Sequence, residues 1–244
     1  MTDQTVNVVN IGKIAEPVRA AVGRFVEVIG RLMGSKTKGI TVYGPAVGAD
    51  FEAARHAVSS VLVLDAVDLN LLRRFATEGA RLGKERISAP LVMTPTYIAE
   101  SCDTFPVELI EIQQHHVTVL GDDFFNDLKF ESQHVRLQCE REFKRILIRL
   151  RQGVLAAAGR EKMLTDLETD IGVHLLRTLR GFLWLKDQKE YQGPKGVIDA
   201  VEKLADRKLN SVRQAVQGTF EHNWSAYESL YRDVEALAGW ANDA

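Results

Sequence analysis

The chain has 244 residues, of which 31 are Lys or Arg and 33 are Asp or Glu, so its formal net charge is −2. This near balance gives no overall attraction to nucleic acid or to an anionic membrane, and we expect neither as a partner. The apolar runs span only a few residues, far fewer than the ~20 that a membrane helix needs. The first residues lack a basic segment before an apolar run, and Cys102 and Cys139 are far apart, which predicts a cytoplasmic protein with reduced thiols.

The first part of the chain alternates between helical and extended patterns. Glu16-Pro17 places an acidic residue and a proline at a helix start, and apolar residues then recur every three or four positions. This stripe comprises Val18, Val22, Phe25, Ile29 and Leu32. Two runs rich in β-branched and apolar residues follow at 39–43 and 58–64, and Gly44-Pro45 comes directly after the first. They predict two strands joined through a tight turn.

The alternation continues beyond the second of these strands. Asp68 is expected to cap a helix, residues 90–93 form a short third strand, and Thr94-Pro95 has the pattern of another helix start. We then predict a fourth strand from Val107 to Ile112 and a fifth from Val117 to Leu120.

From Ser132 onward the apolar residues recur with a helical period. The first long stripe comprises Val135, Cys139, Phe143, Ile146, Leu147, Leu150 and Val154. The change of period predicts a domain boundary near Lys129, with an α/β domain at 1–129 and a helical bundle at 130–244. The expected fold class is therefore α+β, in which a mixed sheet of about five strands precedes an all-α bundle.

A family resemblance rests on four stretches of the chain, which are 39–65, 105–112, 119–123 and 134–142. Together they resemble the nucleotidyltransferase superfamily, whose members include the aminoglycoside adenylyltransferases and the minimal nucleotidyltransferases. In that family one strand ends in Gly-Ser, and the next carries two metal-binding carboxylates on alternate positions. The likeness covers roughly residues 36 to 155 and implies a nucleotidyltransferase-like domain followed by a helical domain.

The residues that should carry the family's chemistry are replaced in this chain. Pro45 stands in place of the serine, and Ala57 and Ser59 stand in place of the two carboxylates. Carboxylates at i and i+2 on a strand point to one side and can hold Mg²⁺, whereas a methyl group and a neutral hydroxyl cannot replace their charge. We therefore expect a pseudoenzyme that binds no metal and has no assigned cofactor.

Two alternatives to this interpretation stay open. In the first, Asp50, Glu52 or Asp65 restores a metal site, and the chain is an active adenylyl- or nucleotidyltransferase that uses ATP and Mg²⁺ on a small hydroxylated acceptor. In the second, the chain is a structural or regulatory homodimer with the helical domain as its interface; there, Trp184, Trp224 and Trp240 belong to the bundle core or the interface.

The resemblance assigns Glu108 to the family's third carboxylate, which can act as a base toward an acceptor hydroxyl. On the predicted strand Glu108 shares its side with Ile110 and Ile112, which suits a cleft residue, and the alternative is a strand-edge glutamate in solvent. Arg136 falls on the apolar side of its helix, so it needs either a carboxylate across the domain junction or a bound phosphate.

We expect these residues to line a cleft between the two domains. Its lining comprises Gly44, Ser59, Ser60, Glu108 and Arg136. Such a cleft would bind a nucleotide or another small anion. The pair His115-His116 lies in a predicted hairpin connection, where adjacent side chains point apart, so it does not predict a metal site.

Overall fold

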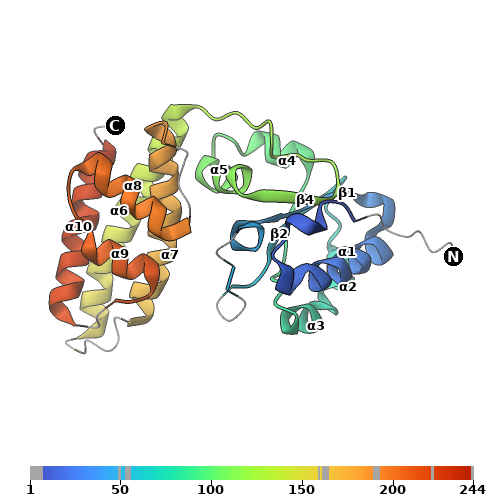
Figure 1. The fold of residues 1–244 in the computed structure, drawn as a ribbon, viewed down its shortest axis with the longest axis horizontal. Helices are drawn as coiled ribbons and strands as arrows, with labels where there is room; N and C mark the ends of the chain where they lie inside the picture. The colour runs from blue at the N-terminus through green and yellow to red at the C-terminus, as the bar shows by residue number, and fades with distance from the viewer. Residues whose placement is uncertain are drawn as a thin grey trace. The chain divides into compact units, whose positions relative to one another are not determined.

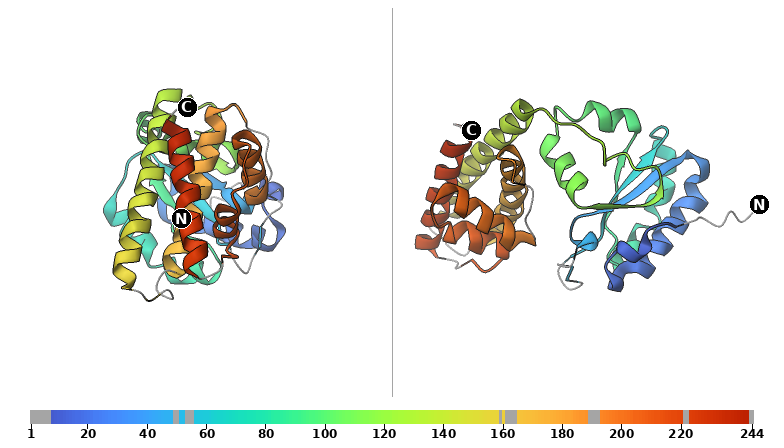
Figure 2. Two further views of the ribbon diagram at one scale, coloured as in Figure 1. Left: turned by 90° about the vertical axis from the view of Figure 1, so that its left-hand side faces the viewer. Right: turned by 45° about the horizontal axis from the view of Figure 1, so that its top comes forward.

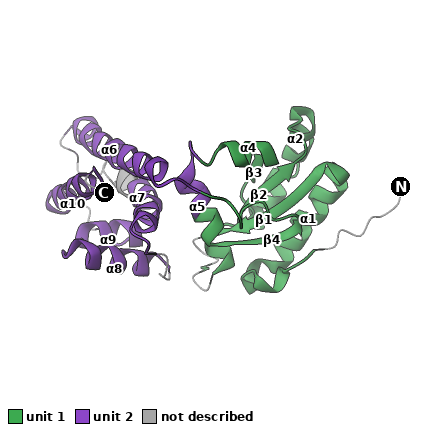
Figure 3. Cartoon of the chain, turned by 90° about the horizontal axis from the view of Figure 1, so that it is seen from above, with its two compact units in different colours: residues 1–102, 111–129 green, residues 103–110, 130–244 purple. Residues whose placement is uncertain are grey.

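The computed structural model describes residues 8–48, 51–52, 56–158, 160, 165–188, 193–220 and 223–242. The fold class is α+β. The chain divides into two compact units, one formed by residues 1–102 and 111–129 and the other by residues 103–110 and 130–244 (Figure 3). The change of unit at 110–111 falls inside one helix, α5 (Pro106–Gln114).

The first unit is built on a mixed sheet that has four strands among the described residues. They are β1 (Thr37–Tyr43), β2 (Ser59–Leu64), β3 (Leu91–Met93) and β4 (His116–Gly121). The order is β3-β2-β1-β4, with β1 antiparallel to both neighbours and β2 parallel to β3. Four of the five predicted strands therefore form, and they do so close to the expected residues.

One face of this sheet is covered by α1 (Arg19–Met33), α2 (Leu69–Ala76) and α3 (Gly79–Lys84), as Figure 1 shows. The predicted stripe of the first helix is confirmed: its first four members are buried, and Leu32 is partly buried. They pack against the side chains of β1, β2 and β4 that point to the same face. These are Ile40, Val42, Leu62, Leu64, Val117 and Val119.

Both predicted helix caps of this unit are confirmed. The side chain of Asp68 accepts hydrogen bonds from the N–H groups of Asn70 and Leu71 at the start of α2. Thr94 does the same for Tyr97 at the start of α4 (Pro95–Glu100), where Pro95 takes the first helical position. Each cap satisfies N–H groups that have no partner inside the helix.

The predicted strand from Val107 to Ile112 is wrong, because these residues form the helix α5. Pro106 begins this helix, and Val107, Leu109, Ile110 and Ile112 are all at most 2% exposed. A short helix that is buried on several sides carries a continuous apolar run rather than a stripe. Such a run does not distinguish a helix from a buried strand.

The second unit contains α6 (Ser132–Ala157), α7 (Thr165–Leu185), α8 (Gly193–Ala205), α9 (Asn210–Gln217) and α10 (Trp224–Asn242). Helix α6 contacts α7 and α10, and the three run side by side in Figure 2. The predicted stripe of α6 is buried in their common core, apart from Val154, which is partly buried. Among the described residues, no helix is both long and apolar enough to cross a membrane.

Candidate functional site

The turn after β1 has an open backbone at Gly44. This residue has a φ of 74°, in the left-handed region, so a side chain here would be strained. Apart from Gly44 itself and its two chain neighbours, no atom of the described residues lies within 4 Å of the place where its Cβ would stand. The Gly44 N–H donates to the carbonyl oxygen of His115 at 2.9 Å, and Pro45 continues into a short 3-10 turn, Gly44–Val47.

Ser59 and Ser60 begin β2, but they belong to different faces of the sheet. Tyr43 lies opposite Ser59 in β2 and opposite His116 in β4, so these three residues form one row. Ser60 belongs to the next row, with Val42, whose side chain is in the core under the helices. Ser60 is 1% exposed, and its hydroxyl has no hydrogen-bond partner in the part of the chain that the structure describes. Of the two serines, Ser59 is the one beside Gly44 whose side chain points away from the helix-covered face.

The positions assigned to the two carboxylates lie at the start of β2. Ala57 is exposed just before the strand, and Ser59 is half-buried two residues later. Of the alternative acidic residues, Asp50 lies outside the described residues, Glu52 is exposed, and Asp65 accepts a hydrogen bond from the N–H of Ala66 at 2.8 Å. In the described ranges, no group of three or more His, Cys, Asp or Glu side chains is placed to hold a metal ion.

Glu108 lies in the first turn of α5, not on a strand beside Ile110 and Ile112 as predicted. One carboxylate oxygen accepts a hydrogen bond from the Gln138 side chain at 2.6 Å, and the other is 3.9 Å from the Arg177 guanidinium. The carboxylate therefore joins α5 to α6 and α7 within the second unit.

Gln138 completes this arrangement from the buried face of α6. Its side chain is 3% exposed, and its amide oxygen accepts a hydrogen bond from the N–H of Val107 at 2.9 Å while its amide nitrogen donates to Glu108. Gln138 thus caps α5 from another helix. Sequence reasoning missed this residue, because a single glutamine within an apolar stripe does not identify its partner.

Arg136 lies on a flank of α6 that is partly open to solvent, and its side chain is 41% exposed. The prediction that it lies on the packed side is therefore wrong. Its guanidinium is 3.4 Å from the carboxylate of Glu140, one helical turn away, and Glu140 also pairs with Lys144. The hydrogen bond from Lys144, together with the nearby charge of Arg136, lowers the pKa of Glu140. A long arginine side chain can extend from the apolar side of a helix and place its charge at the surface. An angular count along the helix places only the Cα atom and does not account for this reach.

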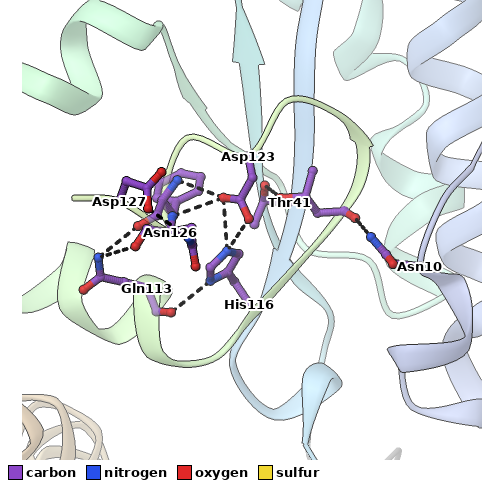
Figure 4. Close-up of polar contacts among 9 residues, drawn as sticks. Asn10, Thr41, Gln113, His116, Asp123, Asn126 and Asp127 are labelled. Atoms are coloured by element: carbon purple, nitrogen blue, oxygen red, sulfur yellow. Dashed lines mark hydrogen bonds and ion pairs between the residues drawn. The ribbon is translucent and has the colours of Figure 1, made fainter.

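In the described part of the first unit, an extensive set of polar contacts centres on His116 and Asp123 (Figure 4). His116 is the first residue of β4, and Asp123 lies two residues beyond the end of that strand. The His116 Nε2 atom is 2.9 and 3.1 Å from the two Asp123 carboxylate oxygens. Its Nδ1 atom is 3.0 Å from the carbonyl oxygen of Gln113. Both partners only accept hydrogen bonds, so a ring with N–H on both nitrogens satisfies both contacts, and a neutral ring satisfies one.

The loop after β4 is held by the same residues. One Asp123 oxygen accepts hydrogen bonds from the N–H groups of Phe125 and Asn126, and the Gln113 side-chain amide donates to three carbonyl oxygens, those of Phe125, Asn126 and Leu128. Burial tends to raise the pKa of Asp123, but the Phe125 N–H and the His116 ring outweigh it and hold that pKa below its ordinary value.

The contacts of His116 favour a structural role, because both ring nitrogens are engaged within the chain. We interpret the His116–Asp123 pair as a structural clasp that fixes the loop. The pair His115-His116 was considered only as a metal site. The signal for the clasp was Asp123, because an aspartate side chain often accepts a hydrogen bond from the backbone N–H two residues further on, as it does here from Phe125.

Comparison of the chain with protein-family models found no match, and comparison with curated proteins found none either.

Proposed function

We propose that this chain is a nucleotidyltransferase-like protein that binds a nucleotide or another small anion and does not catalyse metal-dependent transfer. The observation that carries the proposal is the junction of β1 and β2, where the open turn at Gly44 lies beside Ser59. Ala57 and Ser59 are neutral at the positions that the resemblance assigns to metal-binding carboxylates. The sequence of helix, mixed sheet and helical bundle also supports the nucleotidyltransferase-like assignment.

The absence of acidic side chains at Ala57 and Ser59 favours binding of an anion over catalysis of nucleotidyl transfer. Nucleotidyl transfer develops negative charge on phosphate oxygens, and divalent metal ions held by carboxylates stabilise that charge. The Ser59 hydroxyl can donate one hydrogen bond to a phosphate oxygen. Because the Gly44 N–H is already used, Gly44 contributes space for close approach rather than a donor. These features favour an anion held without a metal.

Isothermal titration of the full chain with ATP tests the proposal directly. We expect the same affinity in EDTA and in Mg²⁺, and no transfer of label from α-³²P ATP to small hydroxylated acceptors. Micromolar ATP binding that requires Mg²⁺, or label transfer that is abolished by Glu108→Gln, would contradict it. Absence of ATP, GTP and inorganic phosphate binding would also contradict it.

Restoring the carboxylates gives a second test. The double substitution Ala57→Asp/Ser59→Asp places two acidic side chains two residues apart at the start of β2, on one side of the chain. We expect it to weaken ATP binding in EDTA, by repulsion of the phosphates, and to make binding in Mg²⁺ tighter by about tenfold or more than in EDTA. The matched control is Ala66→Asp, an exposed position beyond the other end of β2, which should leave both affinities unchanged.

A further inference from the structure

The bundle carries an apolar groove between α6 and α10. Its cavity has a volume of about 350 Å³. Its apolar lining comprises Leu150, Val154, Leu155, Trp224, Tyr227 and Tyr231. All of these residues belong to the second unit.

Two large apolar side chains at this groove are left in water. Leu155 is 81% exposed and Trp224 is 47% exposed. Neither belongs to the bundle core, whereas Leu150 of α6 is buried in it. Single exposed apolar residues are common, but a leucine and a tryptophan that border one apolar cavity are typical of an interaction surface.

The aromatic wall of the groove is held in place by its own contacts. The Tyr227 hydroxyl donates to the carbonyl oxygen of Leu150 at 2.6 Å, and the Trp224 ring stacks on Tyr227 with centroids 6.0 Å apart and planes at 16°. The guanidinium of Arg151 donates to the Tyr231 hydroxyl at 2.6 and 2.9 Å. The groove is therefore formed before any partner binds, which lowers the entropy cost of association.

The charges at the groove favour a second copy of the chain as its partner. Arg151 of α6 and Glu228 of α10 both border the cavity, and both are exposed. Glu228 also accepts a hydrogen bond at 2.6 Å from Arg232, which lies one turn further along α10. The surface thus combines a protruding leucine, an apolar cavity and exposed charges of both signs. In a two-fold symmetric dimer each patch meets its own copy, so residue i contacts j and j contacts i. A patch with a projection, a recess and both signs of charge is complementary to itself.

We propose that this groove is the interface of a homodimer in which Leu155 of each copy enters the cavity beside Trp224 of the other. Arg151 of each copy faces Glu228 of the other. This proposal concerns the second unit alone and does not depend on the proposed nucleotide binding.

Sedimentation velocity of the full chain over a range of concentrations tests the dimer. We expect wild-type chain to sediment as a dimer and Leu155→Asp to raise the dissociation constant by about 30-fold or more, as loss of a central apolar anchor does. Circular dichroism should be unchanged, because the side chain is exposed. The matched control is Val173→Asp, at a residue of α7 that is 61% exposed and does not line the groove, and it should remain a dimer. A wild-type monomer at all concentrations, or equal dissociation of both variants, would overturn the proposal.

Charge reversal tests the geometry of the pair. Arg151→Glu and Glu228→Arg alone each place like charges across the interface twice, so each variant should dissociate. An equimolar mixture of the two should form dimers again, because the introduced glutamate of one chain then faces the introduced arginine of the other, and the two original residues face each other. A change in folding would not be repaired by mixing. If the mixture stays monomeric while both single variants dissociate, the proposed pairing of Arg151 with Glu228 is wrong.

Discussion

The ring of His116 meets a hydrogen-bond acceptor on each side, the carbonyl oxygen of Gln113 and the carboxylate of Asp123. Its side chain is only 8% exposed, whereas that of Asp123 is 39% exposed. Water screens the exposed Asp123 carboxylate but hardly reaches the His116 ring. The pair should therefore stabilise the fold only modestly, by about 1 kcal/mol.

Asp123→Asn should reveal this contribution through its dependence on pH. The pKa of Asp123 in the folded chain is below the ordinary value of 3.8. The charged carboxylate thus stabilises the fold above pH 3.8, and the contribution is lost as the pH falls through the lower, folded pKa. We expect Asp123→Asn to reduce the free energy of unfolding by about 1 kcal/mol at pH 7 and by less at pH 3, measured by urea denaturation.

Asp122→Asn is the control for this experiment. Asp122 is an exposed neighbour in the same loop, and its substitution should have little effect at either pH. An equal loss of stability for Asp123→Asn at pH 7 and pH 3 would show that the carboxylate charge does not act through the clasp.

At the scale of the elements, the backbones of α7 and α9 approach each other closely at Gly172. A Cβ on this residue would overlap the carbonyl group of Ala215, which belongs to the other helix. The contact involves two backbones, so no side-chain rotation can relieve it. A glycine inside a helix is unfavourable by itself, but here it allows the two helices to pack at this distance.

Gly172→Ala should therefore destabilise the bundle by about 3 kcal/mol, at the upper end of the usual cost of overpacking, because the contact is between two backbones. Gly239→Ala is the matched control, because Gly239 lies in α10 and, apart from its own stretch of helix backbone, no atom of the described residues is within 4 Å of its Cβ position. It should stabilise the bundle by up to about 1 kcal/mol. Thermal unfolding followed by circular dichroism gives both values, and a neutral Gly172→Ala would contradict the close approach.

The sequence predicted those elements whose stabilising contacts are local. The stripes of α1 and α6 and the caps at Asp68 and Thr94 each lie within a few residues of the structure they specify, and all were found. Helix α5 was missed because it is buried on several sides and because its cap, Gln138, lies 31 positions from Val107 along the chain. Contacts at this separation leave no periodic pattern in the sequence.

The candidate site was predictable to the same extent. The antiparallel pairing of β1 with β2 places Ser59 beside Gly44. The predicted turn between the two strands already implied this proximity. Ser60 was expected in the same cleft, but side chains alternate along a strand, and its register with Val42 places it against the helix-covered core. Glu108 was assigned from a predicted strand, but its observed partner is Gln138. Arg136 was assigned from an angular count along its helix, but its observed partner is Glu140. Neither pattern specifies these contacts.

At the scale of the whole molecule, two buried clusters of apolar side chains have no residue in common. One is formed by residues of the first unit, and the other by residues of 103–110 and 130–244. Phe25 is fully buried in the first cluster and Phe143 in the second. A cluster of this kind is the cooperative unit of unfolding, because loss of one member weakens the packing of the others.

We therefore expect two unfolding transitions in calorimetry of the full chain, each assignable by one substitution. Phe25→Ala should lower the transition of the first unit and Phe143→Ala that of the second, with a loss of about 3 to 5 kcal/mol in each case, because a fully buried phenyl ring leaves a cavity that rigid neighbours cannot fill. The unaffected transition serves as an internal control in each variant. If both substitutions shift one common transition by similar amounts, the two cores unfold as a single cooperative unit and the expectation is wrong.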